Sequence, residues 1–178
     1  MTVLRGEALD LRTVSRAALF SALGLAFPVL FHLVRLGSVF LPMYLPLLAG
    51  AFLLPVGWAI AIGVATPLIS AVATGMPPFF PPVAAWMAVE LGVTCGIVSL
   101  LRRRMLPKVV VLVAVLMLGR AVYLGLVYAT SAWLRLPAGL LTVTSLLAGW
   151  PGVVLALLAV PPAVAAVERR WPVGEVAP

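Results

Sequence analysis

Apolar side chains fill long runs of this chain, and polar residues gather in the short segments between those runs. The runs lie at about 15–35, 44–54, 58–74, 82–101, 108–132 and 141–167. A helix needs about 20 apolar residues to cross a bilayer. The pattern therefore predicts an all-α integral membrane protein, a six-transmembrane-helix bundle. The second run is short and holds Pro46, so we expect it to be tilted or partly buried.

The composition excludes an ordinary soluble domain. Of the 178 residues, 64% are hydrophobic and 10% are charged, whereas a soluble domain carries about 25% charged residues. The six runs with their short loops use nearly the whole length. We therefore expect a single membrane domain over residues 1–178, with no soluble appendage.

The basic residues are distributed unequally between the two sides of the predicted bundle. With the N-terminus inside, one side receives Arg5, Arg12, Arg16, Arg102, Arg103, Arg104, Lys108, Arg169 and Arg170, and the other only Arg35 and Arg135. Cytoplasmic loops carry an excess of Lys and Arg. This predicts that both termini are cytoplasmic in a plasma-membrane protein. The net charge of +7 is then explained by topology and attraction to anionic lipid, without nucleic acid.

A proline-rich apolar loop separates the third run from the fourth. It contains Met76, Pro77, Pro78, Phe79 and Phe80. The prolines cannot continue a helix, because each lacks an N–H and fixes φ. A loop this apolar suits a lid that packs over a pocket embedded in the membrane, on the outer side of the predicted topology.

Two ionisable residues lie well inside predicted spans, Glu90 in the fourth and Arg120 in the fifth. A charge at membrane depth is costly, so such residues face the bundle interior and indicate function by default. Their depths allow the two side chains to meet. One interpretation is a structural ion pair. The other is a pair at the floor of a ligand cavity, where the planar Arg fork binds a carboxylate or phosphate.

Four further residues are candidates for ligand contact. His32 is the only histidine and lies near the outer end of the first run; it is either a solvated helix end or a ligand-contacting donor. Trp86, Tyr123 and Trp150 are either part of an interfacial aromatic belt or the lining of a cavity. Their depth in the runs favours the cavity.

The motifs that enzymes need are absent. The chain has no Gly-x-Ser-x-Gly elbow and no His-Glu-x-x-His motif, and one His with one Cys cannot form a usual metal site. It also lacks the phosphate-binding Gly-x-x-x-x-Gly-Lys loop. We expect no enzyme activity, cofactor or metal here, so any ATP hydrolysis that drives transport belongs to partner subunits.

Small residues form one face of the first span. Ala18, Ala22 and Ala26 recur every four residues, with Gly24 beside them. Such a face allows another helix to approach closely. The approaching helix is either a neighbour within this protein or a helix of a partner.

Several segments resemble the S components of energy-coupling factor (ECF) transporters. They are FLPMYLPLLAG at 40–50, PLIS-x-x-x-TGMPP-x-FP at 67–81 followed by Glu90, Gly119-Arg120, and Gly149-Trp150-Pro151-Gly152. The likeness covers roughly residues 14–167, and the TGMPP-x-FP run is its most specific part. It implies a six-helix substrate-binding subunit of an importer for a vitamin or similar micronutrient.

The resemblance also implies partners and a site. The partners are an EcfT-like transmembrane coupling subunit, contacted through Ala18, Ala22 and Ala26, and two cytosolic ATPases. Substrate is captured from outside, under the loops. The resemblance implies a histidine at the position where this chain has Tyr44. The tyrosine weakens the case for a ligand that two histidines would bind, such as heme with two axial histidines.

The substrate stays open at this stage. A pocket of Glu90, Arg120, His32, Tyr44 and aromatic residues suits a partly apolar molecule with an anionic or zwitterionic end. Pantothenate, another B vitamin and a tetrapyrrole all fit that description. Two other functions also remain: a structural or assembly subunit without its own ligand, and a lone channel or intramembrane enzyme.

Overall fold

The computed structural model describes residues 11–33, 42–102, 104, 106–134 and 138–170, and no side chain at positions 32, 131–134 and 138–148. Within these ranges the chain forms helices and no strand. The helices are α1 (Leu11–Leu33), α3 (Tyr44–Leu53), α4 (Val56–Thr74), α5 (Val83–Leu101), α6 (Lys108–Leu134) and α7 (Ala138–Arg170).

The six apolar runs of the sequence correspond to these six helices, so the all-helical prediction is confirmed. Five of the helices, α1 and α4 to α7, contain apolar segments of 19 to 23 residues, long enough to cross a membrane. This is the pattern of a multi-pass membrane protein. The exception is α3, which has only 10 residues, as its short run predicted.

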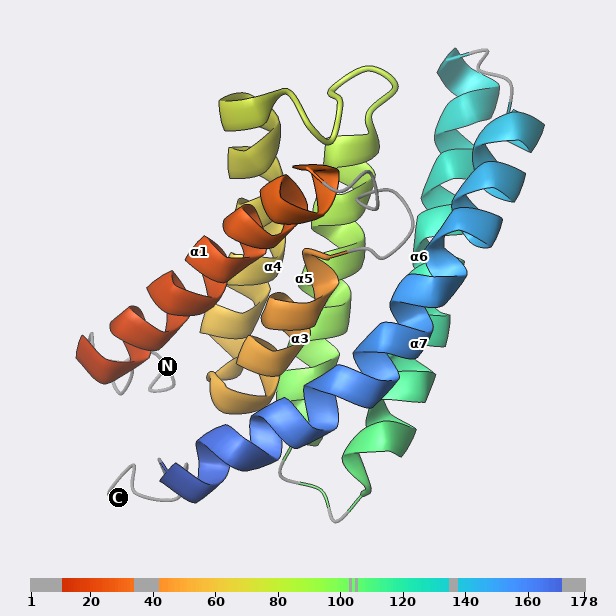
Figure 1. The fold of residues 1–178 in the computed structure, drawn as a ribbon. Helices are drawn as coiled ribbons and strands as arrows, with labels where there is room; N and C mark the ends of the chain where they lie inside the picture. The colour runs from red at the N-terminus through yellow and green to blue at the C-terminus, as the bar shows by residue number, and fades with distance from the viewer. Residues whose placement is uncertain (1–10, 34–41, 103, 105, 135–137, 171–178) are drawn as a thin grey trace, which may run out of the picture.

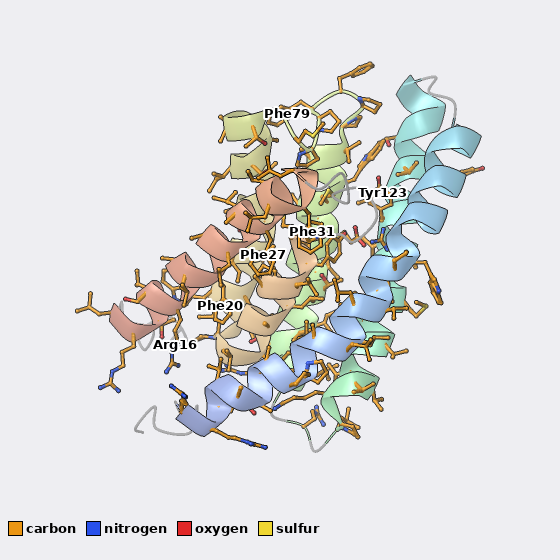
Figure 2. The ribbon with its side chains drawn as sticks, viewed as in Figure 1. Arg16, Phe20, Phe27, Phe31, Phe79 and Tyr123 are labelled. Carbon is orange, nitrogen blue, oxygen red and sulfur yellow. The ribbon has the colours of Figure 1, made fainter. Side chains whose placement is uncertain are left out.

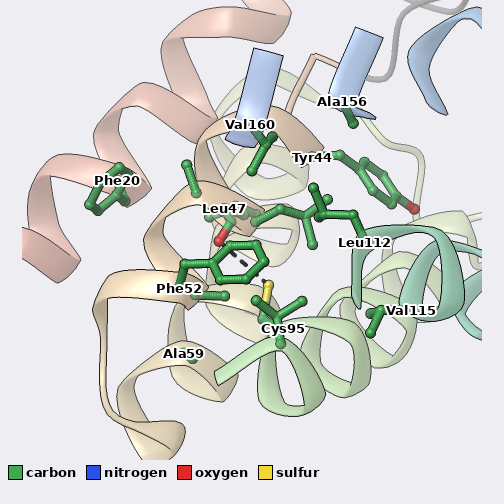
Figure 3. Packing of buried hydrophobic residues seen from close by; sticks show 14 of the residues in the cluster. Phe20, Tyr44, Leu47, Phe52, Ala59, Cys95, Leu112, Val115, Ala156 and Val160 are labelled. Atoms are coloured by element: carbon green, nitrogen blue, oxygen red, sulfur yellow. Dashed lines mark hydrogen bonds between the residues drawn. The ribbon is translucent and has the colours of Figure 1, made fainter. Parts of the chain in front are cut away.

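The short helix α3 lies at the centre of the bundle. Nine of its ten residues are buried, and it contacts α1, α4, α5 and α7. Leu47 and Leu48 are fully buried in the same apolar cluster as Leu91 of α5 and Leu112 of α6 (Figure 3). Because α3 is surrounded by longer helices, it does not need the length of an independent span.

Close contact between α4 and α5 fixes the position of α5, the helix that carries Glu90. A Cβ atom added at Gly63 would lie 2.6 Å from the backbone oxygen of Leu91, and one at Gly92 would lie 2.7 Å from Val64 Cγ2. Small residues at these positions let the two backbones approach. As a result α5 is held firmly against α4, and Glu90 lies next to this contact in the chain.

The small-residue face of α1 points away from the bundle. Phe20 and Ala17 are buried against the core, and a Cβ atom at Gly24 would lie 3.0 Å from Thr66 Cγ2 of α4. The three alanines Ala18, Ala22 and Ala26 are exposed on another side of the helix. Packing within the described part of the protein therefore does not cover them.

The loop after α4 lies at one end of the bundle, beyond the ends of α4 and α5 (Figure 1). Gly75 ends α4 with a positive φ of 74°, a conformation that glycine adopts without steric cost. The carbonyl of Met76 accepts hydrogen bonds from the hydroxyls of Ser70 and Thr74. These bonds tie the start of the loop to the last turn of α4.

The opposite end of the bundle holds the start of α1, the end of α7 and the connection between α5 and α6 (Figure 1). There Lys108 of α6 forms an ion pair with Glu168 of α7. Arg12, Arg16, Arg169 and Arg170 also belong to these helix ends. The two described chain ends therefore share one end of the bundle, together with most of the described positive charge.

Candidate functional site

Glu90 is the only described acid inside the bundle, and it is 1% exposed. It lies at the start of the third turn of α5, a helix that is apolar on nearly every other side. The Tyr44 hydroxyl at the start of α3 donates a hydrogen bond to Glu90 Oε2. Figure 3 shows this hydroxyl pointing away from the apolar cluster around Leu47. A buried carboxylate needs such a donor, because desolvation is otherwise uncompensated.

Arg120 of α6 supplies the opposite charge. Its Nε lies 3.8 Å from Glu90 Oε1, and its side chain is 14% exposed. The contact confirms the predicted meeting of the two residues. At 3.8 Å it is an electrostatic contact and not a hydrogen bond, for which an N–O distance of about 2.7–3.2 Å is usual.

The guanidinium of Arg120 lies between two tyrosine rings. Its Cζ is 5.5 Å from the centre of the Tyr44 ring and 5.9 Å from that of Tyr123. A cation within about 6 Å of an aromatic face is attracted by the ring quadrupole. The two rings thus fix the direction of the guanidinium and keep its charge inside the bundle.

Trp86 extends the site along α5. Its ring meets the Tyr123 ring edge to face, with centroids 6.0 Å apart and an interplanar angle of 88°. Together with Val127, the two aromatic residues form a small buried cluster separate from the main core. Tyr123 lies toward the end of the bundle that carries Phe79, and far from Arg16 (Figure 2).

Two buried donors at this site lack a hydrogen-bond partner among the described residues. They are Arg120 Nη2 and Trp86 Nε1. Most buried polar atoms in proteins are paired, and each exception calls for an explanation such as a missing ligand. Both belong to residues whose side chains lie against the Tyr123 ring.

Gly119 makes room for the charged pair. A Cβ atom there would lie 2.6 Å from Thr94 Cγ2 and 3.4 Å from Glu90 Oε1. Any side chain at this position would clash with the threonine one turn further along α5, and would come into contact with the carboxylate. Gly119 therefore lets α6 approach α5 closely, and this approach brings the charge of Arg120 next to Glu90.

The structure brings together five of the seven predicted ligand-contacting residues: Glu90, Arg120, Tyr44, Trp86 and Tyr123. It places Trp150 apart from them, because that ring is 61% exposed on α7. His32 belongs to α1, and its side chain lies outside the described residues. Of the predicted lid, Met76, Phe79 and Phe80 are 56%, 56% and 73% exposed, so the loop is not packed onto the cluster.

Two residues of the site were not recognised as such in the sequence. Gly119 was named only as part of the Gly119-Arg120 segment that resembles ECF S components, and Thr94 was not named. A signal for Thr94 exists, since it follows Glu90 by four residues and so lies on the same helix face.

Comparison with protein-family models, curated proteins and solved structures finds no match to this chain.

Proposed function

We propose that this protein is the substrate-binding membrane subunit of an ATP-driven importer of the energy-coupling factor type, and that it captures a vitamin-like small molecule. The observation that carries the proposal is the buried cluster of Glu90, Tyr44, Arg120, Tyr123 and Trp86, with two donors left unpaired within the described residues. A purely structural polar network is expected to satisfy its own donors.

The position of the cluster supports capture from one side of the membrane. Its residue Tyr123 lies toward the end of the bundle that carries Phe79 of the loop at 76–82, and far from Arg16 at the basic helix ends. If the basic end is cytoplasmic, as the distribution of Lys and Arg favours, then the loop lies on the outer side of the membrane, and the ring of Tyr123 lies toward that side. The loop would close over a bound substrate, burying the apolar side chains that are exposed without it.

The exposed alanine face of α1 supports a partner in the membrane. Within the described part of the chain Ala18, Ala22 and Ala26 are exposed, so a helix of a coupling subunit can approach them closely. Energy would then come from two ATPases bound to that subunit, since this chain has no nucleotide-binding loop.

Native mass spectrometry of the purified full-length protein tests the binding function. We expect a co-purified small molecule with the wild type and with Trp150→Ala, whose ring is exposed. The same molecule should be absent, or its occupancy reduced at least about tenfold, with Trp86→Ala and Tyr123→Ala, which remove large aromatic contacts.

Two results would contradict the proposal. One is the absence of any bound small molecule from a protein that is folded and binds no coupling subunit; this favours a structural or assembly subunit. The other is a bound molecule whose occupancy falls with Trp150→Ala and not with Trp86→Ala, which places the binding site elsewhere.

A further inference from the structure

We infer that the substrate carries a single carboxylate, and that Arg120 and Trp86 bind it while Glu90 only positions Arg120. This inference rests on the proposed binding function and assigns different roles to the two charged residues. It narrows the substrate class from anionic or zwitterionic molecules to monoanionic ones.

Glu90 is closed to a ligand. The carboxylate is 1% exposed, Oε2 accepts the Tyr44 hydroxyl, and Oε1 faces Arg120 Nε. Oε1 also lies 3.4 Å from the position of a Cβ atom at Gly119, so the α6 backbone covers that side. A substrate ammonium group would have to displace one of these neighbours to reach Glu90.

Arg120 keeps a hydrogen-bond donor that no described residue uses. Glu90 Oε1 stays 3.8 Å from Nε, and Nη2, which lies on the same edge of the guanidinium as the Nε–H, is buried without a hydrogen-bond partner among the residues described. A guanidinium is a planar fork that matches a carboxylate with two parallel N–H···O bonds. Glu90 and the rings of Tyr44 and Tyr123 hold the guanidinium in place, and its Nη2 donor remains to bind a ligand oxygen.

Trp86 adds a second donor and an apolar wall. Its Nε1–H is unpaired within the described structure, the residue is 3% exposed, and its ring contacts Tyr123. An indole N–H can only donate, so the matching ligand atom is an acceptor such as a carboxylate or carbonyl oxygen. The aromatic surfaces of Trp86 and Tyr123 suit an uncharged apolar body next to that group.

The charge balance favours one negative charge over two. Arg120 and Glu90 together sum to zero, so a monoanionic substrate brings the site to a net charge of −1. A dianionic phosphate would bring it to −2 at a depth where each unpaired charge is costly. Other charged side chains are not found against the cluster in the described ranges.

The test measures the melting temperature of the full-length protein in detergent with matched probes. These are pantothenate and panthenol, biotin and biotinamide, nicotinate and nicotinamide, and the cation thiamine. We expect at least one carboxylate to stabilise the protein, with an apparent Kd at least about tenfold lower than that of its uncharged counterpart, the effect of a charge-assisted hydrogen bond. Stronger binding of an uncharged probe or of thiamine, or stabilisation by none of the carboxylates, overturns the inference.

Substitutions separate the two roles. Arg120→Lys keeps the positive charge without the fork, and should weaken binding of the carboxylate probe at least about tenfold. Trp86→Phe keeps the ring and removes the donor, and should weaken it several-fold. Glu90→Gln removes a negative charge that does not touch the ligand. It should leave the preference for carboxylate over amide in place, whereas a loss of that preference shows that Glu90 contacts the substrate.

The binding function itself can stand when this inference fails. A co-purified molecule that is cationic or uncharged in the native mass spectrum supports the proposed function and overturns the carboxylate assignment. If no molecule co-purifies, that result counts against the proposed binding function only. The carboxylate assignment is tested separately, because the titrations use carboxylates that are added to the protein.

Discussion

The Tyr44 hydroxyl donates a hydrogen bond to the carboxylate of Glu90, a residue 46 positions further along the chain. It connects the first turn of the buried helix α3 to the third turn of α5. This bond and the approach of Arg120 from α6 bring three helices together at one polar point inside an apolar bundle. The stability of that point can be tested separately from ligand binding.

We expect Tyr44→Phe to destabilise the protein by about 1–3 kcal/mol, the cost of leaving a buried acceptor without its donor. Reversible unfolding in mixed micelles measures the free energy of unfolding. Ser15→Ala is the control, since this hydroxyl is exposed and bonds to the Leu11 carbonyl of its own helix; its effect should stay within about 0.5 kcal/mol. Equal effects for the two variants would contradict a stabilising role for the Tyr44 bond.

Removing Arg120 should cost more than removing the whole charged pair. Arg120→Met leaves Glu90 buried without its counter-charge, a loss of about 3–5 kcal/mol in comparable pairs. In the double variant Glu90→Gln with Arg120→Met no charge remains, so most of the stability should return. Strictly additive effects of the two substitutions on the free energy of unfolding would show that the residues do not interact.

The same double variant separates structure from binding. It should fold and fail to bind a carboxylate probe, because the guanidinium fork is gone. Near-native affinity measured by probe titration would assign the pair to structure alone.

Gly119→Ala should destabilise by about 1–3 kcal/mol, the usual cost of overpacking. The added methyl would lie 2.6 Å from Thr94 Cγ2, next to Glu90. Gly125→Ala on the same helix has no atom within 4 Å of the new methyl and should be neutral or stabilising by up to about 1 kcal/mol. Chemical denaturation of both variants gives the comparison, and a Gly119→Ala protein as stable as Gly125→Ala would contradict the close approach of α5 and α6.

Ala22→Trp should prevent co-purification with the coupling subunit and leave the melting temperature of the isolated protein nearly unchanged. Ala22 is exposed among the described helices, so the bulky ring would point toward a partner helix or lipid. Leu158→Trp, at an α7 position that is 70% exposed, is the matched control and should keep the complex. If Ala22→Trp also keeps it, the small face of α1 is not the contact surface.

Closure of the Met76–Pro82 loop predicts a distance change on ligand binding. Spin labels at Phe80 and Leu33, which are 73% and 77% exposed, can be introduced in a Cys95→Ala background, since Cys95 is the only cysteine. Pulsed electron paramagnetic resonance should show a narrower, shifted distance distribution with saturating substrate. An unchanged distribution would leave the loop without a role in closure.

The sequence by itself determined the helical architecture. Long apolar runs separated by Pro, Gly and basic residues predict membrane helices because the bilayer leaves a backbone no partner other than its own. The same reasoning identified Glu90 and Arg120 as candidate site residues, since a charged side chain inside an apolar run is costly and is usually paired or functional. The shortness of the run at 44–54 also indicated that α3 is not an ordinary span.

Only the tertiary structure decided which residues meet and which remain exposed. Trp86, Tyr123 and Trp150 look alike in the sequence, yet the first two are buried together and the third is 61% exposed. Likewise the face of α1 that carries Ala18, Ala22 and Ala26 is left open, while Phe20 on another face enters the core. In helices that are apolar on every side, the hydrophobic pattern does not choose a face. Close packing, glycine contacts and the pairing of buried charges make that choice.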